Sequence, residues 1–315
     1  MSPRSTQLHA VTGAFGYSGQ HIARRLLEAG HRVRTLTSSP GRPGSLQGQV
    51  EVAPLCFQDP AGLRQALQGV QVLHNTYWVR FNHRTFTHAN AVQNTRALFQ
   101  AAQDVGVERV VHVSITNPSA NSDLEYFRGK GQLEEALASS GLSHAILRPA
   151  VLFGGDDILV NNMAWAVRHL PVLGVFGDGG YRLQPIHVED LAGLAVTHAG
   201  HQDDVVVEAI GPEPYTFRGL LELLCKVLGR SRPVLPVPPR LGYLLAWGMG
   251  RLLQDVLLTW EEIEGLMADL LYVDAPPAGT ERLSVWARAH AGTLGLRYAS
   301  EMARRRHRRR SYGVH

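Results

Sequence analysis

The feature that most constrains the fold is a glycine-rich turn near the start of the chain, in the stretch AVTGAFGYSGQ. Gly13, Gly16 and Gly19 follow a short apolar run and open a segment of helical periodicity. Glycines at this spacing let the backbone turn tightly and approach a pyrophosphate at a helix N-terminus. Close packing of the strand on the helix would favour the same glycines. We expect a dinucleotide site in this loop, which also contains Phe15 and Tyr17.

Short β-branched runs alternate with segments of helical periodicity from Gln7 to Pro149. The runs are, in order, QLHAVT, HRVRTLT, VEVAPL, VQVLHNT, VERVVHVSI and LSHAILRP. This alternation is typical of βαβ units and predicts an α/β fold with a doubly wound parallel sheet of the Rossmann type. We expect an NAD(P)-binding domain over residues 1–155.

The pattern becomes less regular after Pro149, where glycine- and proline-rich stretches separate three or four helical segments. Such a region typically forms a smaller lid over the strand ends, where open α/β sheets bind ligands. We expect a mainly helical substrate domain over 156–303, partly interleaved with the sheet, and a basic tail over 304–315. Weaker candidates for lining a substrate pocket are Asp156, Asp157, Tyr181, Arg182 and His187.

The positive charge of the chain is concentrated in that tail. Without the six arginines of RRRHRRR (304–310), the formal net charge of +4 becomes −2. Charge runs at chain ends are usually solvated, so nucleic acid binding is not favoured and would depend on the tail alone.

The remaining composition argues against several other classes of site. Cys56 and Cys225 form no disulfide framework and have no metal-ligand spacing, and the histidines form no HxH or HxxxH cluster. These features predict a reducing compartment and no metal site. The start of the chain has no apolar core of a signal peptide, and LGYLLAWGMGRLLQDVLLT is interrupted by polar residues. We therefore expect a cytoplasmic protein with no membrane span, in which this apolar stretch is a buried or pocket-lining helix.

The end of the second predicted strand bears on the choice of cofactor. NAD-selective sites usually place a carboxylate here to bind the ribose hydroxyls. This chain instead has Thr37, Ser38 and Ser39, and Arg42 or Arg34 could reach a 2′-phosphate. The pattern favours NADP(H) over NAD(H).

The segment YFRGK places Tyr126 and Lys130 one turn apart on a predicted helix. A phenol has a free pKa of about 10, and a nearby ammonium favours the phenolate, so this pair can move a proton beside a hydride carrier. Such spacing also occurs by chance on exposed helices. The chain has only 2 lysines against 29 arginines, however, and one of the two stands here. This use of lysine favours a functional pair.

The motifs TGAFGYSG, VLHNT, VHVS, YFRGK and ILRPAVLFGG, in this order, resemble the short-chain dehydrogenase/reductase superfamily in its extended and atypical branches. Within it, the chain is most similar to NmrA-like and complex I 39-kDa-subunit-like NAD(P)H-binding proteins. The resemblance implies that Tyr126 is the catalytic acid or base, and that Lys130 lowers its pKa and holds the nicotinamide ribose. It also implies that Asn75, Thr76 and Pro149 lie near the nicotinamide.

The chain departs from the family pattern at the substrate oxygen. The family has a Ser or Thr just after the fifth strand, where this chain has Ile115. Ser114 or Thr116 would have to replace it, and since strand residues alternate between faces, these two point together and away from Ile115.

Two further departures affect the adenine site and the proton relay. Cys56 stands where the family has an acid that contacts adenine, and Asp59 is expected to cap the following helix. The relay asparagine of the family falls at Ala91, with Asn90 and Asn94 as neighbours.

Two hypotheses follow for the Rossmann unit. The first is an NAD(P)H-dependent oxidoreductase or epimerase-like enzyme for a small polar or sugar-like carbonyl or alcohol, with Tyr126 as acid/base, Lys130 as its tuner and Ser114 or Thr116 as oxyanion partner. The second is a non-catalytic NADP(H)-binding sensor or scaffold. The expected partner is a small-molecule substrate, and a homodimer is possible.

Overall fold

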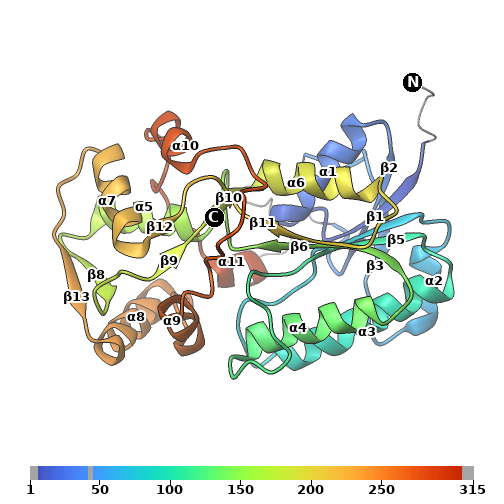
Figure 1. Ribbon diagram of the computed structural model, residues 1–315, viewed down its shortest axis with the longest axis horizontal. Coiled ribbons are helices and arrows are strands. Elements are labelled where there is room, and N and C mark those ends of the chain that lie inside the picture. Colours follow the sequence, from blue (N-terminus) through green and yellow to red (C-terminus); the bar gives the residue numbers. More distant parts are fainter. Residues whose placement is uncertain (1–5, 42–44, 307–315) are drawn as a thin grey trace. The chain divides into compact units, whose positions relative to one another are not determined.

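The computed structural model describes residues 6–41 and 45–306, which form two compact units (Figure 1). Unit 1 contains the described residues up to Arg148 together with Leu191–Val207. Unit 2 contains Pro149–Asp190 and the described residues from Glu208 onward. The chain therefore leaves unit 1, returns to it for a short segment, and leaves it again.

Unit 1 is built around a seven-stranded sheet with the strand order β11-β6-β5-β4-β1-β2-β3. Strands β1 to β6 all pair in parallel, which confirms the doubly wound fold. The order reverses between β1 and β4, and open α/β sheets bind ligands at such a switch point. The strands are β1 (Leu8–Thr12), β2 (Arg32–Thr37), β3 (Glu51–Pro54), β4 (Val72–Asn75), β5 (Arg109–Val113), β6 (Ser143–Pro149) and β11 (Val205–Ala209).

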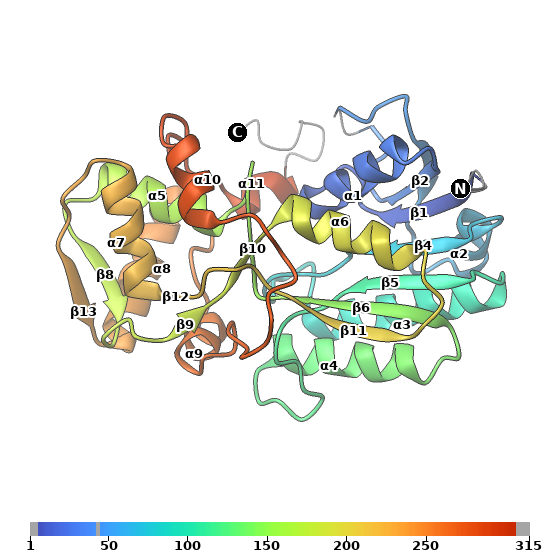
Figure 2. The same ribbon diagram turned by 45° about the horizontal axis from the view of Figure 1, so that its top comes forward.

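Helices cover both faces of this sheet (Figure 2). On one face lie α2, α3 and α4, whose apolar sides supply Leu63, Leu98 and Leu133 to a core shared with Ala10 and Leu73 of the sheet. On the other face lie α1 and α6 (Figures 1 and 2). The helices are α1 (Tyr17–Glu28), α2 (Pro60–Leu67), α3 (His88–Asp104), α4 (Glu125–Ala138) and α6 (Val188–Ala199).

Unit 2 is mainly helical, as expected, and it also contains three two-stranded ladders that the sequence pattern did not indicate. These strands are only two to four residues long, too short to show a period. The helices are α5 (Leu159–His169), α7 (Phe217–Val227), α8 (Pro239–Leu253), α9 (Trp260–Met267), α10 (Leu283–Ala289) and α11 (Glu301–Arg306). The ladders pair β7 (Val151–Phe153) with β10 (Pro185–His187), β8 (Leu173–Phe176) with β13 (Val234–Val237), and β9 (Arg182–Leu183) with β12 (Tyr215–Thr216).

The apolar stretch for which a buried helix is expected forms α8, and that expectation is wrong. Gly250 is the one buried residue of α8, and several of its leucines are exposed. The reason is that Gly242, Gly250 and Tyr243, rather than the leucines at 241, 244, 245 and 252, pack against the rest of unit 2. Within the described part of the chain, no helix has the length and apolar character needed to cross a membrane.

Candidate functional site

The glycine loop has the backbone geometry that its sequence predicts. Gly13 adopts a φ of 69°, a left-handed conformation that favours glycine, and its N–H donates to the carbonyl of Leu36 at 2.9 Å. The Gly16 N–H donates to the Gly13 carbonyl at 2.7 Å, which closes the turn. A Cβ on Gly19 would overlap that same carbonyl oxygen. Gly13 is thus favoured by its backbone conformation, and Gly16 and Gly19 by the close approach of the Gly13 carbonyl.

The N-terminus of α1 is suited to an anion. Gly16 is the N-cap residue and provides no side-chain cap, and no acidic residue stands in the first turn of this described helix. The Ala14 N–H donates to Thr35 Oγ1 at 3.1 Å, which anchors the loop to β2. Phe15 is buried and Tyr17 half-buried beside it. The N–H groups of a first helical turn and the positive end of the helix dipole suit a pyrophosphate here.

The end of β2 carries hydroxyl groups, as the sequence indicates. Thr37 Oγ1 accepts a hydrogen bond from the Ser39 N–H at 3.0 Å, and Ser38 is exposed. Arg34 does not face this edge, which corrects one of the two predicted phosphate ligands. Its guanidinium pairs with Glu51 at 2.8 Å and donates to the carbonyls of α2 and the residue after it, because this side chain points toward β3. Arg42 lies outside the described residues.

Asn75 and Thr76 form hydrogen bonds that join neighbouring strands at the switch point. Asn75 is fully buried, and its Oδ1 accepts a hydrogen bond from Thr12 Oγ1 at 3.2 Å while its Nδ2 lies 3.0 Å from His112 Nδ1. Thr76 Oγ1 donates to the Thr12 carbonyl at 2.6 Å, and the Thr76 N–H donates to Thr12 Oγ1. Asn75 therefore joins β1, β4 and β5, and contact of this residue with the nicotinamide stays a prediction.

Lys130 is buried at the end of β5. Its side chain is 2% exposed, and Nζ donates to the carbonyl of Val113 at 2.8 Å. Burial lowers the pKa of Lys130 to about 7, against the opposing attraction of Glu134. A charged ammonium is costly to bury, so the fold holds this nitrogen near the point where it changes charge at neutral pH.

Trp78 lies against both members of the Tyr–Lys pair. Lys130 Nζ is 4.6 Å from the centre of the Trp78 ring, and the Tyr126 ring meets that ring edge-on at 5.7 Å. Gly129 provides the space, since a Cβ there would lie 2.8 Å from Trp78 Cη2. Sequence reasoning missed this residue, although an aromatic residue three positions after the β4 strand end was a usable signal.

The segment after β5 is entirely buried at Ser114, Ile115 and Thr116. The Ser114 N–H donates to the Leu147 carbonyl at 2.7 Å, which ties the segment to β6. Ser114 Oγ is buried and has no hydrogen-bond partner among the described residues. Contact of Ser114 or Thr116 with a substrate oxygen stays a prediction.

Four more predicted positions belong to unit 1. Cys56 is exposed, and Asp59 caps α2 by accepting a hydrogen bond from the Gly62 N–H at 2.9 Å, as its sequence position indicates. Ala91 is fully buried, whereas Asn94 Nδ2 donates to the hydroxyl of Tyr77 at 2.9 Å. Asn94 therefore contacts the segment after β4, next to Trp78.

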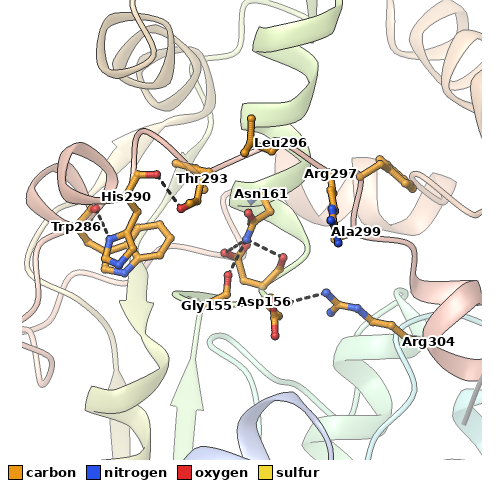
Figure 3. Close-up of a pocket in the computed structure, with 13 residues that line it drawn as sticks. Gly155, Asp156, Asn161, Trp286, His290, Thr293, Leu296, Arg297, Ala299 and Arg304 are labelled. Atoms are coloured by element: carbon orange, nitrogen blue, oxygen red, sulfur yellow. Dashed lines mark hydrogen bonds between the residues drawn. The ribbon is translucent and has the colours of Figure 1, made fainter. Parts of the chain in front are cut away.

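Unit 2 contains a cavity of about 500 Å³ (Figure 3). Asp157 lies in the wall of this cavity and caps α5. Its carboxylate accepts hydrogen bonds from the Val160 N–H at 2.7 Å and from Asn161 Nδ2 at 2.9 Å. Burial raises the pKa of Asp157 to about 7. The cavity is lined by Gly155, Asp156, Asp157, Asn161, Trp286, His290, Thr293, Leu294, Leu296, Arg297, Tyr298, Ala299 and Arg304.

The basic tail was expected to begin at residue 304, but Arg304 is buried in unit 2. Its sequence position predicts a solvated charge run, but it is 5% exposed and its Nη2 donates to the Asp156 carbonyl at 2.6 Å (Figure 3). The reason is that α11 directs this side chain into unit 2. Residues 307–310, the rest of the run on which any nucleic acid binding would depend, lie outside the described residues.

Of the five weaker candidates, the two acids line the cavity and the other three do not. Tyr181 is buried, and burial raises its pKa to about 12. Arg182 pairs with Asp269 at 2.8 Å. His187 packs edge-on against Phe153 with ring centres 5.1 Å apart. The aromatic wall formed by Trp286 and His290, whose rings stack at 4.6 Å, was not predicted.

A family model described as NAD(P)H-binding matches residues 13–164 of this chain. A mitochondrial protein of Arabidopsis thaliana, named NADH dehydrogenase [ubiquinone] 1 alpha subcomplex subunit 9, is 27% identical over 228 residues. That match covers 68% of this chain and 56% of the Arabidopsis protein, so the chain spans little more than half of this relative.

Two solved structures share the fold. A nucleoside-diphosphate-sugar epimerase from Staphylococcus aureus gives a TM-score of 0.73 at 16% identity, covering 90% of this chain and 100% of that one. An NADPH-dependent quinone oxidoreductase from Escherichia coli, solved with NADPH, gives a TM-score of 0.72 at 19% identity and the same coverage.

Proposed function

We propose that this chain, which resembles the extended and atypical branch of the short-chain dehydrogenase/reductase superfamily, is an NAD(P)H-dependent oxidoreductase or epimerase-like enzyme. Its substrate is a small polar or sugar-like carbonyl compound or alcohol. The observation that carries the proposal is Lys130, a buried lysine with its pKa lowered to about 7, one helical turn from Tyr126.

The residues of the glycine loop fit a dinucleotide. The left-handed backbone at Gly13 favours glycine, and at Gly19 the Gly13 carbonyl leaves no room for a side chain. The N-terminus of α1, which has no side-chain cap, suits the pyrophosphate. We expect Thr37 and Ser38, at the end of β2, to contact the adenosine ribose, and the lack of a carboxylate at 37–39 supports NADP(H) over NAD(H). When bound, the nicotinamide supplies or accepts the hydride.

Side chains of unit 1 transfer the proton to and from the substrate oxygen. Tyr126 donates its hydroxyl proton to the substrate oxygen as the carbonyl is reduced, or removes it in the reverse reaction. Lys130, which is held by the Val113 carbonyl, stabilises the phenolate that remains. Ser114 Oγ, buried without a partner among the described residues, donates to the same substrate oxygen.

We propose separately that the cavity of unit 2 binds a small polar molecule. Its stacked Trp286 and His290 suit the face of a ring, and Asn161 and Thr293 supply polar groups that can fix its orientation. This combination supports a small polar or sugar-like molecule. The neighbours in the fold include proteins named for nucleotide-sugar epimerisation and for quinone reduction.

A second candidate function is a protein that binds NADP(H) without turnover. It is favoured by the position of Trp78, which covers Lys130 and lies against Tyr126. The Arabidopsis relative is named as a subunit of a larger dehydrogenase complex, which supports the same alternative. The homodimer and the cytoplasmic location stay predictions, testable by sedimentation and by cell fractionation.

The deciding experiment combines cofactor binding with turnover. The protein is titrated with NADPH and NADH, then assayed for oxidation of the preferred cofactor with aldehydes and quinones. Nucleotide sugars are tested with the oxidised cofactor by following the epimeric product, because epimerisation returns the hydride and leaves the cofactor unchanged. Tyr126→Phe should lower kcat by about 100-fold or more while cofactor affinity stays within about twofold. Tyr243→Phe, on half-buried Tyr243 of α8, is the matched control and should leave both unchanged.

The alternative gives a different set of results. Without turnover, no compound in the panel oxidises the cofactor or is epimerised, and Lys130→Met leaves the affinity for NADPH as it was. A weaker affinity in Lys130→Met, combined with turnover that depends on Tyr126, supports the enzyme. Turnover that survives Tyr126→Phe unchanged refutes the role assigned to this tyrosine.

A further inference from the structure

Helix α8 presents its large apolar side chains to solvent. Leu244 and Leu245 are each 59% exposed and Leu252 is 84% exposed, values that are unusual for leucine. Leu241 and Trp247 are also about half exposed. Positions 241, 244, 245, 248 and 252 follow the spacing of a single helical face. We call this face, formed by Leu241, Leu244, Leu245, Trp247 and Leu252 with Arg240 and Arg251 beside it, the α8 surface.

The opposite side of the helix explains why these leucines point outward. Gly242 packs on β8, where a Cβ would lie 2.5 Å from Cε1 of Phe176. Gly250 meets the carbonyl oxygen of Asp255, which would lie 2.7 Å from an added Cβ. The two glycines therefore pack against the rest of unit 2, and the leucines remain exposed, where they can contact another partner. An exposed apolar face of this kind marks an interaction site.

The charge of the α8 surface indicates the partner. Arg240 and Arg251 are exposed on the same face as the leucines, and residues 239–254 contain no Asp or Glu. The Arg251 guanidinium lies 5.0 Å from the centre of the Trp247 ring. An apolar helical face bordered by arginines and a tryptophan is typical of helices that lie in the interface of a bilayer with anionic lipids.

A second copy of this chain is a poorer partner for the same surface. An isologous contact brings the same surfaces together, so the arginines of one α8 would approach those of the other. The helix has no acidic residue to offset their repulsion. Exposed leucines with Arg240 and Arg251 beside them favour an anionic lipid surface. Its headgroups carry the negative charge that would pair with these arginines.

We propose that the α8 surface docks this protein onto anionic membranes. The leucines enter the interface while Arg240 and Arg251 contact lipid phosphates. This inference is independent of the proposed oxidoreductase activity, because it rests on a helix that contributes no residue to the glycine loop or the Tyr–Lys pair.

The test is flotation of the full chain with vesicles of phosphatidylcholine containing about 30% phosphatidylglycerol, compared with phosphatidylcholine alone. The wild type should float with the anionic vesicles, and added salt should weaken the binding. The variant Leu244→Gln/Leu245→Gln should reduce binding by about tenfold or more. Val285→Gln, at a valine of α10 that is 52% exposed, is the matched control and should bind as the wild type does.

Further variants distinguish the α8 surface from the basic end of the chain. Arg240→Gln/Arg251→Gln should weaken binding to anionic vesicles. Deleting 307–315 should leave binding dependent on the leucines; if deletion abolishes it and the leucine variant has no effect, the basic end of the chain is responsible and the proposal is wrong. The proposal is also overturned if the wild type does not float, or if it dimerises through these leucines without binding vesicles.

A spectroscopic measurement covers the case in which the leucine variant fails to fold. A polarity-sensitive dye on Leu252→Cys, in a Cys56→Ser background that removes the exposed native thiol, should shift to shorter emission wavelength on addition of anionic vesicles. An unshifted spectrum contradicts insertion of α8. Circular dichroism and retained NADPH binding check that each variant is folded.

Discussion

Lys130 Nζ lies 4.6 Å from the centre of the Trp78 ring, and Gly129, the residue before Lys130, leaves the space that this ring occupies. The YFRGK segment is therefore more than a tyrosine and a lysine one turn apart. Its glycine admits an indole between the helix and the end of β4, and this indole excludes water from the lysine.

The role of Gly129 can be tested by Gly129→Ala. Alanine is ordinarily favoured over glycine within a helix by about 1 kcal/mol, but the added methyl would press on Trp78 Cη2 and Val92. We expect a net loss of about 1–3 kcal/mol in the free energy of unfolding, as overpacked cores show. Urea denaturation measures it. Gly248→Ala, in α8 with open space around the glycine, should instead stabilise slightly, and equal effects at the two sites would contradict the packing argument.

The glycine loop predicts a graded series of cofactor affinities. Gly19→Ala should overlap the Gly13 carbonyl oxygen and distort the turn, which lowers NADPH affinity by about tenfold or more. Gly16→Ala meets the same oxygen at 3.1 Å and should cost less. Gly193→Ala, whose methyl would approach only the flexible end of Arg25, should bind NADPH normally. Isothermal titration calorimetry gives the order, and an affinity of Gly19→Ala equal to wild type removes the loop from the binding site.

The buried histidines predict a loss of stability in mild acid. His9 Nδ1 lies 3.0 Å from His74 Nε2 between β1 and β4. Burial lowers the pKa of His9 from 6.5 to about 4, and it lowers the pKa of His74 well below its ordinary value. Below pH 6.5 the unfolded chain therefore binds more protons than the folded one, and the free energy of unfolding falls by about 1.4 kcal/mol per pH unit for each such histidine.

The variant His9→Gln isolates this effect. Between pH 6.5 and 4.5, denaturant melts should show a slope of unfolding free energy against pH that is smaller by about one proton than in the wild type. Val285→Gln, at an exposed valine of α10, alters no titratable group and should keep the wild-type slope. An unchanged slope in His9→Gln would mean that this ring is protonated in the folded protein.

Asp157 predicts a pH dependence of the opposite sign. Because burial raises its pKa from 3.8 to about 7, the unfolded chain releases this proton at lower pH than the folded one. Asp157 therefore costs stability as the pH rises from about 4 toward 7, by about 1.4 kcal/mol per unit. Asp157→Asn, which can still cap α5, should gain stability relative to the wild type over this range. Thermal melts at pH 4 and 7 measure the gain, and a constant difference would show an ionised Asp157 at both pH values.

The sequence was informative where a feature depends on neighbours along the chain. The glycine loop, the strand alternation and the cap formed by Asp59 are local, and each has the expected form. Trp78 was missed because its place depends on Gly129, some fifty positions later in the chain and on another element. The walls of the cavity come from 155–161 and 286–304, which only the tertiary fold brings together.

Two predictions about burial were wrong because they were made from the composition of a segment and not from the direction of each side chain. Arg304 looks solvated within a charge run, yet α11 turns it inward. The leucines of α8 look like a core, yet the glycines of that helix occupy the inner side. In both segments the direction of each side chain is set by helix packing, which average hydropathy and charge do not encode.

The division of the chain between the two units bears on how the protein is made. Strand β11 lies at the edge of the sheet beside β6, and it is contributed by a segment that follows the first part of unit 2. A nascent chain that has reached only β6 therefore leaves the edge of that strand open, a state prone to wrong pairing. The sheet can be completed on the ribosome only after Ala209 has emerged. A shortened chain ending near residue 155 should accordingly aggregate, however complete its cofactor loop is.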